Sequence, residues 1–149
     1  MTYFFSSTEG VLSGRLSSWN ALAGFLRENP FHALLGIGYK TLPYSNFVGQ
    51  PMVGDNMYLT LLVETGVVGL AAFLALNVAI LRASYRAATN PNSHASFFGT
   101  WIFCFWTGQM FQMLSGDLFT YWRVLPFYFW ALAVAVRAAN EHPLPRSIQ

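Results

Sequence analysis

The sequence GDNMYLTLLVETGVVGL, residues 54–70, joins a polar head that carries an acid and an amide directly to an apolar run. The run continues to Leu81, so residues 57–81 are long enough to cross the ~30 Å hydrocarbon core of a bilayer as a helix. A backbone in contact with lipid must satisfy its own hydrogen bonds, and a helix does so. This stretch therefore predicts a membrane-spanning helix with an Asp–Asn pair at its entrance.

The composition supports a membrane protein. Of 149 residues, 54% are hydrophobic and only 9% are charged, whereas about a quarter of the residues in a typical globular chain are charged. The net charge is only +2 and the charged residues are scattered along the chain, which gives no support for nucleic-acid binding. The single cysteine and the three histidines show no metal-ligand spacing, and no glycine-rich phosphate loop is present. We therefore expect no metal and no cofactor.

Two further segments are apolar enough to be spans. Residues 95–114 form the second, and the shorter, aromatic-rich residues 118–137 form the third. We therefore predict an all-α integral membrane domain of three transmembrane helices over residues 57–139, preceded by an outer segment. The final residues, 140–149, form a tail.

The arginines predict the orientation. Arg82 and Arg86 lie in the connector after the first span with no acid beside them, and Arg137 ends the third span, with Arg146 after it. The positive-inside rule places both regions and the tail in the cytoplasm, and residues 1–56 on the opposite face. Because that outer segment has no span or export signal before it, we expect the chain to be the C-terminal part of a longer polytopic protein.

The outer segment begins with a predicted amphipathic helix over residues 13–28. Its apolar residues recur at helical spacing, Ser13 is a candidate N-cap and ENP at 28–30 is a stop signal. Arg15 then falls in the first helical turn, where free N–H groups and a guanidinium together favour phosphate. The alternative is a solvated or interfacial arginine.

The Asp55–Asn56 pair has two interpretations. Either residue can cap the helix that begins at Met57, and a carboxylate at a membrane surface can also accept a proton from a hydroxyl nucleophile. Glu64 lies two turns into the span, where an ionisable group is by default functional or paired, so we expect it to hold a charged partner. Gly66 and Gly69 begin a small-residue stripe that favours close helix packing.

The remaining polar residues of the spans have a structural interpretation. Asn77 in the first span and Gln109 and Gln112 in the second are suited to interhelical hydrogen bonds. Arg123 follows two aromatic residues in the outer connector, where it either extends toward the interface or faces a site.

Three pieces of sequence occur in a characteristic order: SGR…W on the outer helix, NPFHALLGIGY after it, and DNMYLTLLVETGVVGLAAF at the first span. Together they resemble the C-terminal portion of the O-antigen ligase and O-antigen polymerase family, which are polytopic glycosyltransferases of the bacterial inner membrane with a C-type glycosyltransferase fold. The resemblance runs from Ser13 to Phe73, with a looser match at TYWRVLPFYFWALA. The order and spacing of the pieces carry it, because no single piece is specific.

The resemblance implies metal-independent transfer of a glycan from an undecaprenyl-diphosphate carrier to an acceptor hydroxyl at the periplasmic face. Arg15 matches a family arginine that engages the diphosphate, and Asp55 stands where the ligases carry a histidine that deprotonates the acceptor. A carboxylate can take that role, and it favours a polymerase-type member over a ligase. Asp55 and Arg15 are thus the predicted catalytic residues. The predicted substrate-binding residues are Asn56, Tyr58, Glu64 and Arg123.

The partners implied are a carrier-linked oligosaccharide, an acceptor glycan or lipid, the bilayer and upstream transmembrane helices. Without those helices, we expect this chain alone to be inactive. The alternative function is a non-catalytic transport or assembly subunit of a polysaccharide system, in which Asp55 is a helix cap and Arg15 an interfacial anchor.

Overall fold

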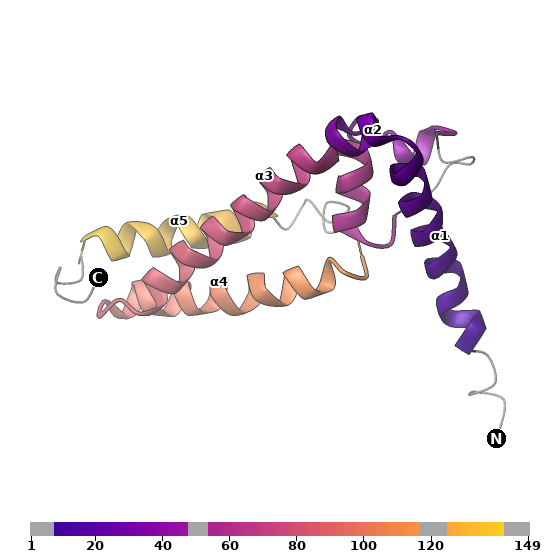
Figure 1. The fold of residues 1–149 in the computed structure, drawn as a ribbon. Helices are drawn as coiled ribbons and strands as arrows, with labels where there is room; N and C mark the ends of the chain where they lie inside the picture. The colour runs from indigo at the N-terminus through magenta and orange to yellow at the C-terminus, as the bar shows by residue number, and fades with distance from the viewer. Residues whose placement is uncertain (1–7, 48–53, 117–124, 142–149) are drawn as a thin grey trace, which may run out of the picture. The chain divides into compact units, whose positions relative to one another are not determined.

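The structure, a computed structural model, describes residues 8–47, 54–116 and 125–141, with side chains from residue 15 onward. All the regular secondary structure in these ranges is helical, which confirms the predicted all-α class. In chain order the elements are α1 (Thr8–Glu28), α2 (Pro30–Leu35), the 3-10 turn η1 (Leu42–Tyr44), α3 (Met57–Ala88), α4 (Ser93–Gln112) and α5 (Leu125–Glu141) (Figure 1).

The chain forms two compact units. The first contains residues 1–72 and 114–116, and the second contains residues 73–113 and those from 117 onward. The division falls within α3, so the beginning of α3 packs in the first unit and its later turns pack in the second.

Among the described helices, α3 alone is long and apolar enough to cross a membrane. It begins at Met57, as predicted, but it ends at Ala88 rather than Leu81. The residues after Leu81 remain helical because they include good helix formers, arginine and alanine among them. Much of the predicted cytoplasmic connector is therefore helix, and only residues 89–92 separate α3 from α4.

The helices α4 and α5 match the second and third predicted spans in position. Asn92 caps α4, because its side chain accepts hydrogen bonds from the N–H groups of His94 and Ala95 at 2.9 and 3.3 Å. The helix α5 begins at Leu125, and the earlier part of the predicted third span, including Arg123, lies outside the described residues.

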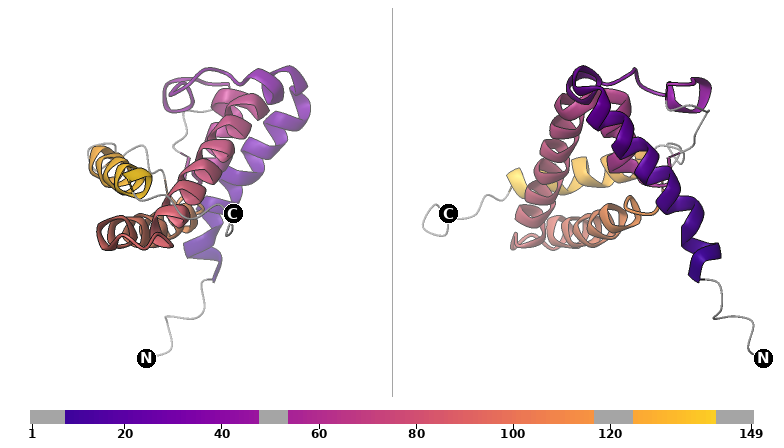
Figure 2. Two further views of the ribbon diagram at one scale, coloured as in Figure 1. Left: turned by 90° about the vertical axis from the view of Figure 1, so that its left-hand side faces the viewer. Right: turned by 45° about the vertical axis from the view of Figure 1, so that its right-hand side comes forward.

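The second unit packs α4 against α5, which lie side by side in both views of Figure 2. Its buried core contains Ile80 from α3, Ile102 and Trp106 from α4, and Ala131 from α5. Asn77 of α3 is fully buried, and its side-chain oxygen accepts the indole N–H of Trp106 at 2.8 Å. The predicted interhelical hydrogen bond is therefore confirmed for this residue.

Replacing Asn77 with leucine is expected to destabilise the second unit by about 1 kcal/mol, because the buried indole N–H loses its acceptor. A double-mutant cycle with Trp106→Phe isolates the contribution of this hydrogen bond. The measured quantity is the free energy of unfolding in detergent micelles. We expect Asn77→Leu to cost less in the Trp106→Phe background than in the wild type. Equal costs in both backgrounds would show that the hydrogen bond does not couple the two helices.

The first unit is built around Leu22 of α1, Leu42 of η1 and Val63 of α3, all nearly inaccessible. The helix α1 begins at Thr8, five residues before the predicted start, so Ser13 lies within the helix and is not its N-cap. Arg15 is consequently two turns from the helix start. The attraction of a helix terminus for anions fades within one turn, so Arg15 has only its own guanidinium with which to bind an anion.

Gly66 breaks the regular course of α3. Its φ of 69° and ψ of −175° are non-helical, and they require glycine because a residue with a side chain rarely adopts that φ. The break frees the carbonyls of Val63 and Glu64, which accept hydrogen bonds from Ile37 and Gly38 at 3.0 and 2.9 Å. We call the binding of residues 36–42 to residues 63–66 the α3 clasp.

The clasp also revises the predicted small-residue stripe. A Cβ on Gly66 would collide with the backbone of Leu34, so the close approach that this glycine permits is to the end of α2. Gly69 lies against the Thr65 side chain of its own helix, and Ala72 is exposed. Gly66 thus bends α3 and holds α2, whereas Gly69 faces a side chain of its own helix.

Candidate functional site

The head of α3 holds Asp55 in a defined position. Gly54 is buried, and a Cβ there would collide with the hydroxyl of Thr60, which itself donates to the Asn56 carbonyl at 2.9 Å. The side-chain oxygen of Asn56 accepts the N–H of Leu59 at 3.1 Å, which is the bond of an N-cap residue. Of the two candidate caps, Asn56 makes this capping bond. The Asp55 carboxylate faces Arg15 instead.

Arg15 and Asp55 come together across the first unit. The guanidinium Nε lies 3.9 Å from the Asp55 Oδ2. Leu22 is two turns beyond Arg15 on α1, and Val63 of α3 is a similar distance beyond Asp55. Both helices therefore run from the ion pair toward the core cluster that Leu22 and Val63 share. Packing of α1 beside the start of α3 therefore explains why two residues 40 positions apart in sequence meet.

This ion pair is open and weak. The Arg15 and Asp55 side chains remain 46% and 45% exposed, and 3.9 Å is too long for a hydrogen bond. Exposed pairs of this kind contribute about 0.2–1 kcal/mol or less. The pair therefore adds little to stability, and a stronger anion or a hydroxyl group can reach either partner.

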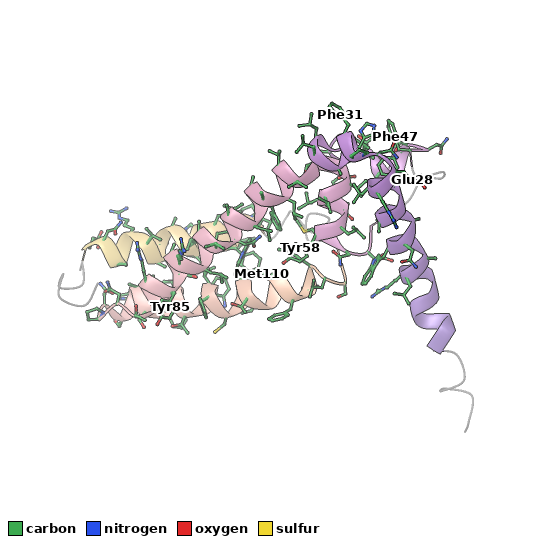
Figure 3. The ribbon with its side chains drawn as sticks, viewed as in Figure 1. Glu28, Phe31, Phe47, Tyr58, Tyr85 and Met110 are labelled. Carbon is green, nitrogen blue, oxygen red and sulfur yellow. The ribbon has the colours of Figure 1, made fainter. Side chains whose placement is uncertain are left out.

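The surroundings of the pair are aromatic on the α1 side. Trp19 lies one turn after Arg15, and its indole N–H is buried with no hydrogen-bond partner within the described part of the chain. Tyr58, a predicted substrate-binding residue, is half-buried in the first turn of α3 (Figure 3). Arg123, the last of the predicted substrate-binding residues, is not among the described residues.

Glu64 occupies a different place from Asp55. Its side chain is 3% exposed, and its carboxylate accepts hydrogen bonds from the N–H groups of Lys40 at 2.9 Å and Leu42 at 3.2 Å. Buried carboxylates are tolerated when several N–H groups satisfy them. These two amides belong to the α3 clasp, so Glu64 has a structural role there, and the charged partner expected for it stays a prediction.

His32 has a role that the sequence did not indicate. Its ring stacks on Phe25 at 5.9 Å and lies 5.8 Å from the ring of Phe47. Its Nδ1 is 3.3 Å from the Gly36 carbonyl oxygen, so it links α2 to the clasp. No group of three metal-ligating side chains occurs in residues 8–47, 54–116 and 125–141. Ring packing of this kind depends on the turn after α2, which has no signature in the sequence.

Comparison of the chain with known proteins finds no match among family models, curated proteins or solved structures.

Proposed function

We propose that the protein is a membrane glycosyltransferase of the O-antigen polymerase or ligase type, which transfers a glycan from an undecaprenyl-diphosphate carrier to an acceptor hydroxyl at the periplasmic face. The observation that carries the proposal is the open ion pair between Arg15 and Asp55. It joins the cation that the resemblance assigns to the diphosphate with the carboxylate that stands in the position of the ligase base.

A membrane location is part of the proposal. The helix α3 is long and apolar enough to cross a bilayer, and large apolar side chains stay exposed on all three helices of the second unit, including Leu76, Phe97 and Phe127. Lipid or additional helices would cover such surfaces. We propose that α3, α4 and α5 are spans of a polytopic inner-membrane protein, with α1 and α2 on the periplasmic side.

The weakness of the ion pair matters for donor binding. A diphosphate offers oxygens that form short, charge-assisted and bidentate hydrogen bonds with a guanidinium. It therefore displaces a carboxylate that lies 3.9 Å away and makes no hydrogen bond to Arg15. Donor binding would then release Asp55 from Arg15 at the point where an acceptor arrives.

The released carboxylate is suited to the chemical step. The acceptor hydroxyl gives its proton to Asp55 as its oxygen bonds to the anomeric carbon, and the bond from that carbon to the phosphate oxygen breaks. Arg15 stabilises the negative charge that develops on the departing diphosphate. The products are an extended glycan, the free carrier diphosphate and a protonated Asp55, which returns its proton to water.

Replacing Arg15 with glutamine is expected to reduce polysaccharide formation by at least about tenfold, because a neutral amide cannot stabilise the departing diphosphate. The readout is polymer amount and chain length in cells that make the full-length protein, at equal protein levels. Arg15→Lys keeps the charge but not the bidentate geometry, so we expect it to retain part of the activity.

Arg27→Gln is the matched control, because Arg27 is an exposed arginine in the last turn of the same helix. It should make polymer at the wild-type level. Normal polymer from Arg15→Gln would remove Arg15 from the mechanism, and equal losses from both variants would indicate a general effect of charge on α1.

A non-catalytic transport or assembly subunit is the second candidate. The ion pair is compatible with this function too, because 3.9 Å and nearly half exposure are also ordinary for a surface pair with no chemical role. The two functions differ in whether the purified full-length protein transfers glycan without other proteins.

A further inference from the structure

A cluster of exposed apolar side chains surrounds α2. Every residue of α2 is at least partly accessible. The apolar residues of the cluster are between 52% and 87% exposed: Phe31, Leu34, Leu35, Tyr39, Tyr44 and Phe47. Figure 3 shows Phe31 and Phe47 at the end of the first unit where α2 lies. We call these six residues the α2 patch.

The α2 patch is attached to the candidate span at one point. Gly66 lies against the Leu34 backbone, Gly36 lies against the Glu64 backbone, and the clasp hydrogen bonds of Ile37 and Gly38 hold the two segments together. Directly after Gly66, Val67 and Val68 are 52% and 58% exposed. The patch is therefore continuous with the exposed apolar surface where the long apolar part of α3 begins.

The chemistry of the patch matches the boundary between lipid and water. Tyrosine and phenylalanine carry large apolar rings, and tyrosine adds a hydroxyl that favours the headgroup region. Lys40 extends its ammonium to 5.7 Å from the ring centre of Tyr39, as a cation at an interface does when its stem lies along apolar surface. Surfaces that bind another transmembrane helix are instead enriched in small residues.

We propose that the α2 patch inserts into the outer-leaflet interface of the bilayer, where lipid covers Phe31, Leu34 and Leu35 while the polar ends of the tyrosines and Lys40 stay among the headgroups. The clasp fixes the depth of the patch, because it joins the end of α2 to α3 at Gly66. Insertion would anchor the first unit, and the Arg15–Asp55 pair within it, at a constant height over the membrane. The proposal depends on α3 spanning the bilayer and is independent of the transfer reaction.

Fluorescent labels on single cysteines test the insertion directly. In a full-length protein with Cys104→Ser and any other cysteine likewise replaced, one cysteine is placed at Phe31, Leu35 or Tyr44, and the labelled protein is reconstituted into phosphatidylglycerol and phosphatidylethanolamine vesicles. Glu28→Cys is the matched control, because Glu28 is an exposed polar residue near the start of α2. Brominated lipids and aqueous iodide then serve as two opposing quenchers.

Insertion predicts that brominated lipid quenches the labels at positions 31 and 35 by at least about threefold more than the label at 28, and that iodide shows the reverse order. The label at position 44, the most exposed site of the patch, should show the same order of quenching by the two reagents as the labels at positions 31 and 35. Stronger iodide quenching at 31 and 35 would show a patch in water, and protection from both quenchers would show a covering protein segment. Either result overturns the proposal. Because the readout needs no activity, it should be unchanged by Asp55→Asn.

Discussion

Asp55→Asn is expected to reduce polymer formation by at least about 100-fold while the protein accumulates at the wild-type level, because an amide cannot accept the acceptor proton. The substitution preserves the shape of the side chain. It also leaves the capping bond of Asn56 intact, and the ion pair that it removes is exposed and contributes about 1 kcal/mol at most. A large loss of product with an unchanged fold is therefore the specific signature of a base.

Chain-length analysis of the polysaccharide in cells that make the full-length variant is the measurement. Glu28→Gln is the matched control, since it neutralises another exposed carboxylate of the first unit. Asp55→Glu keeps a carboxylate on a longer side chain and should retain more product than Asp55→Asn. If Asp55→Asn makes wild-type polymer, Asp55 is a structural neighbour of Arg15 and not the base.

Gly66→Ala is expected to have the largest effect on stability. The added Cβ would meet the backbone of Leu34, which cannot move aside as a flexible side chain can, and alanine rarely adopts a φ of 69°. Strain and overlap together should cost about 3 kcal/mol. Because the cost falls on the α3 clasp, we expect the amides of Ile37 and Gly38 to lose protection against hydrogen exchange.

Gly24→Ala provides the matched control for that measurement. Gly24 lies in α1, where a new Cβ would find open space, so alanine should stabilise the helix by about 0.5–1 kcal/mol. Hydrogen–deuterium exchange of residues 36–42 in detergent micelles compares the two variants with the wild type. Unchanged protection in Gly66→Ala would mean that the break at Gly66 does not hold the clasp.

Local patterns predicted the parts of the fold that local physics determines. The start of α3 at Met57 follows from a capping residue before an apolar run, and the hydrogen bond from the Leu59 N–H shows that Asn56 is that cap. The burial and pairing of Asn77 follow from the cost of an unpaired amide in an apolar helix. Both features could be predicted from the sequence, because each depends only on neighbouring residues or on a general rule about buried polar groups.

Contacts distant in sequence account for what the patterns missed. The close approach of another helix to Gly66 was expected, but the break in α3 at this residue was not, because it becomes favourable only when the N–H groups of Ile37 and Gly38 donate to the carbonyls that it frees. The two amide donors to Glu64 were likewise not predicted, because Lys40 and Leu42 lie more than 20 residues before it in the sequence. The sequence predicted that Arg15 and Asp55 lie on the same side of a membrane, but their contact depends on how α1 packs beside α3.

We propose that the Arg15–Asp55 pair belongs to a glycosyl-transfer site, and a transfer assay with the purified full-length protein tests this most directly. A carrier-linked oligosaccharide serves as donor and acceptor, and the product is a carrier-linked dimer of the repeat unit. We predict transfer by the wild type with a metal chelator present, and product at least about 100-fold lower with Asp55→Asn. Equal rates for wild type and Asp55→Asn, or no transfer by a folded wild-type protein supplied with the donor of its own cells, would contradict the account.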